Sequence, residues 1–349
     1  MKLLILGGAA LAMAAAGMAQ RMPEEGASPA DSDLATFRVQ VRSLFVRDSF
    51  AELDALASQL RTGKLRFKGG TWRLNIFYTA LATPGAVATD EQWQARIEKL
   101  ERWIKSDPAS PTPRVALAQA YLNFADKARG AGYSNTVTPE GWALFRERIQ
   151  QARAALEAAA QISGRDPEWY HAMQVVAIQQ GWDQSHMEAL TAEAAKVEPT
   201  YYPPYSLVQA MYLLPIWHGH PGDTERYVEQ AADQTGGAAG DAEYCVVAVL
   251  LNCCGATKAP GMRWARVRQG FEAVDQLYGS TSHLWNMMAF VALRAGDPQF
   301  AQQMFERIGN DWDVDVWRAK ALFDASRTGK TMGSAQPLKA DWTDAGGVN

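Results

Sequence analysis

The chain has 349 residues, of which 48% are hydrophobic and 21% are charged, and its net charge is -4 at pH 7. Nonspecific affinity for nucleic acid comes from neutralised phosphates, so this mild acidity excludes nucleic acid as an expected partner. The sequence has no block of Lys and Arg of the kind that binds an anionic membrane surface. The length suits either several domains or one continuous array of helical repeats.

The first 19 residues are typical of a secretory signal peptide. Lys2 precedes an apolar run from Leu3 to Ala16, and small residues follow at Gly17 and Ala19. The run is short for a membrane span, which takes about 20 apolar residues; an uncleaved anchor is the alternative. We expect an exported bacterial protein, periplasmic or secreted, with no membrane span after signal cleavage.

Composition divides the remainder into four expected segments. Residues 20–32 carry Pro, Gly, Ser and acidic residues without apolar periodicity, which predicts a disordered leader. Residues 328–349 have a similar composition and are predicted to form a flexible tail. Between them we expect a helical domain at 33–255 and tetratricopeptide-like C-terminal helices at 256–327.

The predicted fold class is all-α. Apolar residues recur at steps of three and four, and alternating strand patterns are absent. Asp-Pro and Glu-Pro junctions predict helix boundaries at Pro108, Pro167 and Pro199. Four groups of polar residues are predicted to cap the helices that follow them. They are Ser49–Glu52, Thr89–Gln92, Ser185–Glu188, and Asp311, Asp313 and Asp315 before Trp317.

Residues 284–309 form the most regular part of the pattern, reading as a helix, a Gly-Asp-Pro turn and a second helix. Small residues there allow two helices to approach closely: Ala289, Ala292, Ala295 and Ala301. Pro167 and Pro199 are 32 residues apart, which is close to the tetratricopeptide period of about 34. The pattern is degenerate elsewhere. We therefore expect a tetratricopeptide-like α-helical hairpin solenoid with irregular repeats.

Three short stretches carry a resemblance to known sequences. They are Phe67–Leu74, Ala128–Tyr133 with Thr136–Thr138, and Leu214–Asp223, whose Trp-His-Gly-x-Pro-Gly-Asp string is the most specific part. Together they resemble an uncharacterised bacterial domain-of-unknown-function family of exported, tetratricopeptide-like helical proteins. The resemblance spans roughly residues 40 to 250. It implies an all-helical fold and no particular substrate.

The first candidate binding segment is the turn from Trp217 to Asp223. His218, His220 and Asp223 offer imidazole and carboxylate groups, and three such ligands with an open position would make a catalytic zinc site. Alternate residues of an extended loop point apart, however, and the glycines and proline predict a tight turn. In that interpretation Asp223 caps a helix that starts at Thr224. We assign Trp217, His218, His220 and Asp223 as binding candidates and expect no metal.

The second candidate segment follows Arg129. An arginine beside exposed backbone amides and aromatic rings can hold a carboxylate or phosphate, so Arg129, Tyr133 and Trp142 are further binding candidates. The alternative is an ordinary loop between helices, whose aromatic rings pack on their neighbours.

No catalytic motif is present, since the chain lacks H-E-x-x-H, G-x-S-x-G and C-x-x-C. We therefore predict no enzyme activity, no catalytic residue and no cofactor. The leading hypothesis is an exported helical-repeat module that binds a protein or peptide. One alternative is a metal-dependent enzyme centred on His218, His220 and Asp223. Another is a structural envelope protein that associates with copies of itself.

Overall fold

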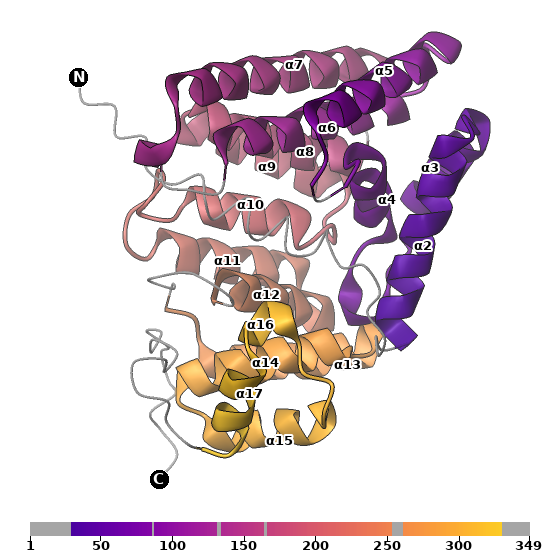
Figure 1. Ribbon diagram of the computed structural model, residues 1–349. Helices are drawn as coiled ribbons and strands as arrows, with labels where there is room; N and C mark the ends of the chain where they lie inside the picture. Colours follow the sequence, from indigo (N-terminus) through magenta and orange to yellow (C-terminus); the bar gives the residue numbers. More distant parts are fainter. Residues whose placement is uncertain (1–28, 86, 131–133, 164–165, 253–260, 330–349) are drawn as a thin grey trace. The chain divides into compact units, whose positions relative to one another are not determined.

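The computed structural model describes residues 29–329, except 86, 131–133, 164–165 and 253–260. Every regular element assigned in this part of the chain is a helix, and the one β-bridge assigned there is an isolated pair, Arg66 and Trp72. The predicted all-α class is therefore confirmed (Figure 1). The predicted signal peptide lies outside the described residues, as does the predicted boundary between 255 and 256.

The described chain divides into two compact units. The first covers residues 33–67 and 71–212. Its helices are α2 (Pro29–Val46), α3 (Phe50–Gly63), α4 (Arg73–Ala82), α5 (Asp90–Ser106), α6 (Thr112–Arg129), the 3-10 turn η2 (Ser134–Thr136), α7 (Pro139–Ser163), α8 (Pro167–Gln180), α9 (Gln184–Val197) and α10 (Pro204–Tyr212). Helix α2 begins at Pro29, inside the segment 20–32 that is expected to be a leader.

Two hydrophobic clusters form the interior of the first unit. The larger gathers α2 to α6, with the fully buried Trp72, Trp103 and Phe77 among its members. The smaller lies between α6, α7 and α8 and contains Phe145 and Leu156. Helix α6 contributes to both clusters, because its apolar residues cover more than one face. It packs on α4, α5, α7 and α8.

The second unit contains the later helices. They are α11 (Asp223–Thr235), α12 (Gly237–Asn252), α13 (Trp264–Tyr278), α14 (Ser282–Ala295), α15 (Pro298–Ile308), α16 (Val314–Trp317) and α17 (Lys320–Arg327), together with the 3-10 turn η1 (Lys68–Gly70). Consecutive helices pack on each other, α11 on α12, α12 on α13 and α14 on α15. Within the residues described, no helix is both long and apolar enough to cross a bilayer.

The Gly-Asp-Pro turn joins α14 to α15 as predicted. Gly296 has a φ of 80°, which ends α14 in the left-handed conformation that glycine adopts without strain. The Asp297 carboxylate accepts the amide of Phe300 at 2.9 Å and caps α15. Ala289, Ala292 and Ala301 are fully buried, in agreement with close packing of these two helices.

Two of the four predicted caps are confirmed and two are wrong. Thr89 forms the complete capping box with Gln92, and Asp313 caps α16 by accepting the amide of Asp315 at 2.8 Å. Ser49 precedes α3, but its side chain makes no capping hydrogen bond. Helix α9 is capped by Asp183 instead of Ser185. Asp183 is better placed because it lies two residues earlier and its carboxylate accepts the amide of His186 at 3.0 Å.

Candidate functional site

The predicted residues at the end of α6 are packed against each other. Arg129 is buried, and its guanidinium donates to the carbonyl of Gly130 at 3.1 Å. Its guanidinium carbon lies 5.8 Å from the centre of the Trp142 ring. That ring meets Phe145 edge-on at 5.5 Å. These contacts are the ones expected of aromatic packing between helices. Tyr133 lies outside the described residues.

The turn from Trp217 to Asp223 is compact and leaves both histidines exposed. The His220 amide donates to the Asp223 carboxylate at 2.7 Å, and the His220 ring nitrogen Nδ1 lies 3.3 Å from the same oxygen. Asp223 also pairs with Arg226. Position 219 tolerates only glycine, because a Cβ there would lie 1.9 Å from the carbonyl oxygen of Leu213.

Asp223 does not have the capping role that the sequence predicted for it. Helix α11 starts at Asp223 itself, and Gly222, with a φ of 89°, takes the capping position. The carboxylate instead holds the preceding turn closed through the His220 amide. A group of three or more His, Cys, Asp or Glu that could hold a metal ion does not occur in the part of the chain the structure describes. The metal-dependent alternative therefore gains no support there.

The predicted binding residues fall in two different units. Arg129 and Trp142 belong to the first unit, whereas Trp217–Asp223 belong to the second. Each group is held by short-range contacts of its own turn or helix pair. Large hydrophobic side chains that stay exposed together on one helix face are a further kind of candidate site.

Helix α2 carries one such set of residues. Val39 and Val46 are 65% and 69% exposed. They are seven residues apart and so lie on one face of the helix, with Arg42 and Ser43 between them. The opposite face is buried in the larger hydrophobic cluster. The positions of these valines fall outside the periodicity of the buried residues of α2.

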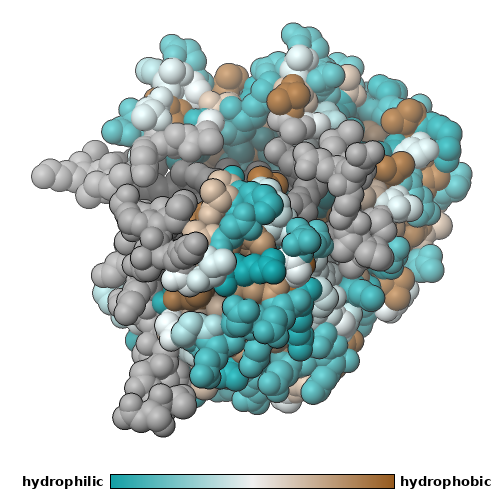
Figure 2. Space-filling model, turned by 60° about the horizontal axis from the view of Figure 1, so that its bottom comes forward, coloured by the Kyte–Doolittle hydropathy of each residue, from teal (hydrophilic) through white to brown (hydrophobic). Residues whose placement is uncertain are grey.

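Single exposed hydrophobic residues are ordinary on protein surfaces. On the face of the molecule drawn in Figure 2, hydrophobic residues form small separate areas among hydrophilic ones. Val39 and Val46 differ from such isolated residues because they share one helix face. They form, with Arg42 and Ser43, what we call the α2 face.

Basic side chains from α5 reach the C-terminal end of α2. Lys99 donates to the carbonyl of Val46 at 2.9 Å and forms an ion pair with Asp48 at 2.9 Å. The guanidinium carbon of Arg96 lies 5.1 Å from the centre of the Phe45 ring. Cations near the last carbonyls of a helix are favourable, so these contacts fix the end of α2 on α5.

A buried group of polar residues lies at the start of α8. Glu168 is fully buried, and its carboxylate accepts a hydrogen bond from Asn75 at 3.0 Å and lies 2.7 Å from Nδ1 of His171. Gln119 and Tyr201 also donate to it. Burial alone raises the pKa of Glu168, but His171, Tyr201 and Gln119 outweigh it, and the pKa is lowered.

Asp166, two residues earlier, has the opposite shift. Burial raises its pKa, while Arg61 and Tyr78 act against that rise. Asp166 also caps α8 by accepting the amide of Glu168 at 2.9 Å. Paired carboxylates with opposite pKa shifts occur at catalytic sites, although structural networks also shift pKa values. Here both carboxylates bind side chains from other helices, so they join those helices in the interior.

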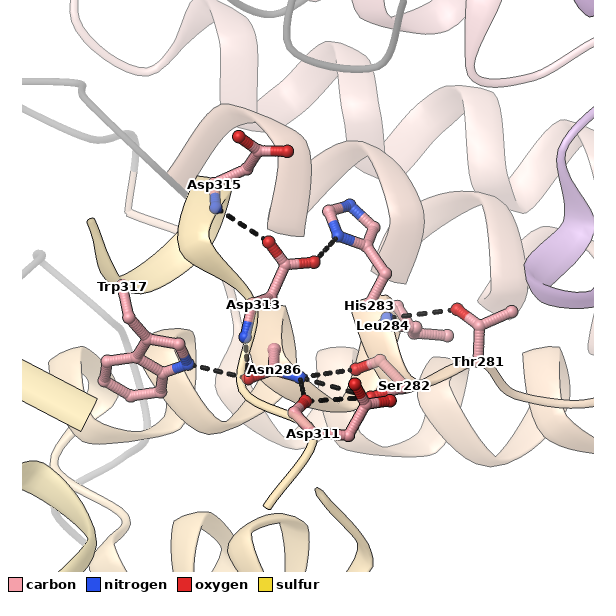
Figure 3. A network of polar contacts seen from close by, with 9 residues as sticks. All are labelled: Thr281, Ser282, His283, Leu284, Asn286, Asp311, Asp313, Asp315 and Trp317. Carbon is pink, nitrogen blue, oxygen red and sulfur yellow. Dashed lines mark hydrogen bonds and ion pairs between the residues drawn. The ribbon is translucent and has the colours of Figure 1, made fainter. Parts of the chain in front are cut away.

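The second unit contains a comparable network around Asn286, drawn in Figure 3. The Asn286 amide group donates to the carbonyls of Ser282 at 2.9 Å and Asp311 at 3.0 Å. Its oxygen accepts the indole N–H of Trp317 at 2.8 Å and the amide of Asp313 at 3.1 Å. These hydrogen bonds hold α16 against α14.

The chain matches no family model, no curated protein and no solved structure. The resemblance to an uncharacterised helical family therefore remains a prediction. The α2 face is the candidate functional site, because Val39 and Val46 are largely exposed on one face of the same helix.

Proposed function

We propose that the chain is an exported, tetratricopeptide-like module that binds a protein or peptide segment on the α2 face. One observation carries the proposal. Val39 and Val46 remain 65% and 69% exposed on one face of a helix whose other face is buried. A helix that docks on a partner through one face places its apolar anchors at spacings of three, four or seven, and Val39 and Val46 have the last of these spacings.

The helical hairpins support the tetratricopeptide-like part of this proposal. Helices α14 and α15 pack on each other across the Gly-Asp-Pro turn, with fully buried alanines at positions 289, 292 and 301. Helices α8 and α9 also pack on each other. The lengths of the helices vary, as expected of an irregular array, and α7 is 25 residues long. Hairpin arrays commonly present helix faces to a partner.

The size of the α2 face favours a transient complex. Full burial of a valine side chain contributes about 1.5–3 kcal/mol. Two such anchors supply at most about 3–6 kcal/mol, whereas the loss of translational and rotational freedom on association costs about 4–15 kcal/mol. Arg42 and Ser43, between the valines, supply the polar contacts that give orientation. We therefore expect reversible binding of one short segment.

A displayed library of random peptides, selected against the folded protein, tests the proposal. Selected peptides should bind the wild type and fail to bind the double variant Val39→Ser/Val46→Ser. The matched control is Val87→Ser, since Val87 is also an exposed valine, at 95%, but lies outside α2. Equal binding of the selected peptides to the double variant would contradict the proposal.

Export is the part of the proposal that rests on the first 19 residues. Mass spectrometry of the protein recovered from its native cell envelope or medium should give a mature chain beginning at Gln20. An intact Met1 in the mature chain would show that the segment is retained instead. The alternative of self-association is tested by sedimentation of the same preparation. If a second copy binds on the α2 face, the wild type should sediment as a dimer and the double variant Val39→Ser/Val46→Ser as a monomer.

A further inference from the structure

The α2 face has an arginine on each side. Arg42 follows Val39 by three residues and precedes Val46 by four, so it neighbours both valines on the helix surface. Arg47 comes directly after the last residue of α2, and its amide donates to the Ser43 carbonyl at 3.2 Å, which continues the helical hydrogen bonding by one residue. At about 3.6 residues per turn, the two arginines lie on opposite sides of the line that joins the valines.

The positive charge of these arginines is not balanced by an ion pair in the part of the chain that the structure describes. Arg47 is exposed, and its Nη1 donates to the Ser43 hydroxyl at 3.1 Å. Arg42 is partly buried. Neither guanidinium contacts a carboxylate of the described residues. A carboxylate supplied by a bound partner can therefore pair with either of them.

The nearest acidic residues along the chain leave this charge in place. Asp48 follows Arg47 but pairs with Lys99 at 2.9 Å. Asp33 is exposed six residues before Val39, which places it about 9 Å from that valine along the axis of α2 at 1.5 Å per residue. It thus stands at the opposite end of the helix from Arg47. The C-terminal half of the α2 face is consequently its positive half.

We propose that the segment bound on the α2 face is acidic, with Asp or Glu residues beside its apolar anchors that pair with Arg42 and Arg47. This inference rests on the proposed function and names the class of its partner. The guanidinium group is a planar fork of donors that matches a carboxylate. Complementary charges at the rim of an interface speed association and fix the orientation of the partner, whereas like charges repel it.

The net charge of the chain, -4 at pH 7, does not oppose this assignment. Charges on exposed groups are largely screened beyond a Debye length of about 8 Å at physiological ionic strength. The two arginines flank the valines directly, so a docked segment meets their charge first. Local charge therefore decides which segments bind on the α2 face.

Parallel selections from the random-peptide library test the inference. Peptides selected on the wild type should be rich in Asp and Glu, and they should fail to bind Val39→Ser/Val46→Ser. Peptides selected on the charge-reversed variant Arg47→Glu should lose that enrichment. Arg146→Glu is the matched control, because Arg146 is an exposed arginine on α7; peptides selected on it should be as acidic as those selected on the wild type.

Binding measurements with one selected peptide give the second readout. Arg47→Gln should weaken the binding of the acidic peptide about two- to fivefold, as expected for an exposed ion pair, and Arg42→Gln should act in the same direction. Neither substitution should weaken the binding of the same peptide with Asn and Gln in place of Asp and Glu. The difference between the two peptides should shrink at high salt.

The outcomes separate this inference from the proposed function. Peptides that need the valines but are neutral or basic overturn the acidic partner and leave docking on the α2 face in place. The same holds for acidic peptides that bind Arg47→Gln as tightly as the wild type. If no selected peptide depends on the valines, docking on the α2 face is itself contradicted, and the acidic partner with it.

Discussion

Arg61 Nη1 lies 2.7 Å from Oδ2 of Asp166, although the two residues are 105 positions apart in the chain. The ion pair joins α3 to the start of α8, where the same carboxylate caps the helix. Asp166 is 1% exposed, so its charge depends on Arg61 for compensation. Asp166 therefore has two roles: it caps α8 at the Asp-Pro helix start, and it holds α8 against α3 through Arg61.

Replacing Arg61 with methionine should destabilise the protein by about 3 kcal/mol or more, because the change leaves a buried carboxylate without its cation. Urea unfolding of the wild type and the variant measures the difference. Lys196→Met is the control, since Lys196 pairs with Glu193 on the surface and exposed ion pairs contribute about 0–1 kcal/mol. Equal effects of the two substitutions would show that the buried pair has no special weight.

Ser49 and Asp297 both stand at the N-cap position of a helix, but their replacement by alanine should change stability by different amounts. Asp297→Ala removes the cap of α15 and the acceptor for the Trp264 indole, at 2.9 Å. It should cost about 1–2 kcal/mol of unfolding free energy. Ser49→Ala should cost far less, because the Ser49 side chain makes no capping bond. Thermal unfolding of both variants checks the difference, and a large effect of Ser49→Ala would contradict the described start of α3.

Asn286 is fully buried and forms hydrogen bonds with four residues of the network in Figure 3. Asn286→Leu has a similar volume but leaves the Trp317 indole and the Asp313 amide without an acceptor. Each unsatisfied buried group costs about 1–3 kcal/mol. Hydrogen exchange should show that α16 loses protection before α14 does. Uniform loss of protection across both helices would argue against this local role.

The pH dependence of stability should contain a contribution from Asp126 on α6. Burial raises the pKa of Asp126 to about 7, although Arg129 acts in the opposite direction. In the unfolded chain an aspartate has a pKa of about 3.9, so between these values only the folded state keeps the proton. The contribution to stability is thus present below about pH 4 and is lost as the pH rises toward 7.

Asp126→Asn removes this contribution, because asparagine does not titrate. Relative to the wild type, the variant should therefore gain stability as the pH rises from about 4 to about 8. Urea unfolding at several pH values measures the difference between the two proteins. A difference that stays constant over this range would show that Asp126 titrates like an ordinary aspartate.

The sequence predicted the elements that depend on neighbouring residues. Helix periodicity, the Thr89–Gln92 box and the Gly-Asp-Pro turn are local, and all three are confirmed. The caps of α3 and α9 were wrong because several polar residues stand near each start. The backbone geometry at the helix start decides which of these side chains accepts a hydrogen bond, and this geometry is hard to read from the sequence. At α9 the acceptor is Asp183 and not Ser185.

The candidate site was less predictable. Arg129 and Trp217 stood out because each lies beside a glycine-rich turn, but they belong to different units. The sequence alone does not predict the α2 face, since the exposure of two valines is known only once the buried face of the helix is known. The partners of Glu168 come from α4, α6 and the segment before α10. Long-range contacts of this kind leave no periodic signal in one sequence.

Site-specific photo-crosslinking in the native cell tests most directly whether the α2 face binds a partner. A photoreactive residue at position 39 or 46 should give the same discrete adduct, and one at position 87 should not. The control is matched because Val87 is the most exposed of the large hydrophobic residues described. Adducts that are absent from positions 39 and 46, or equally abundant from position 87, would contradict the claim.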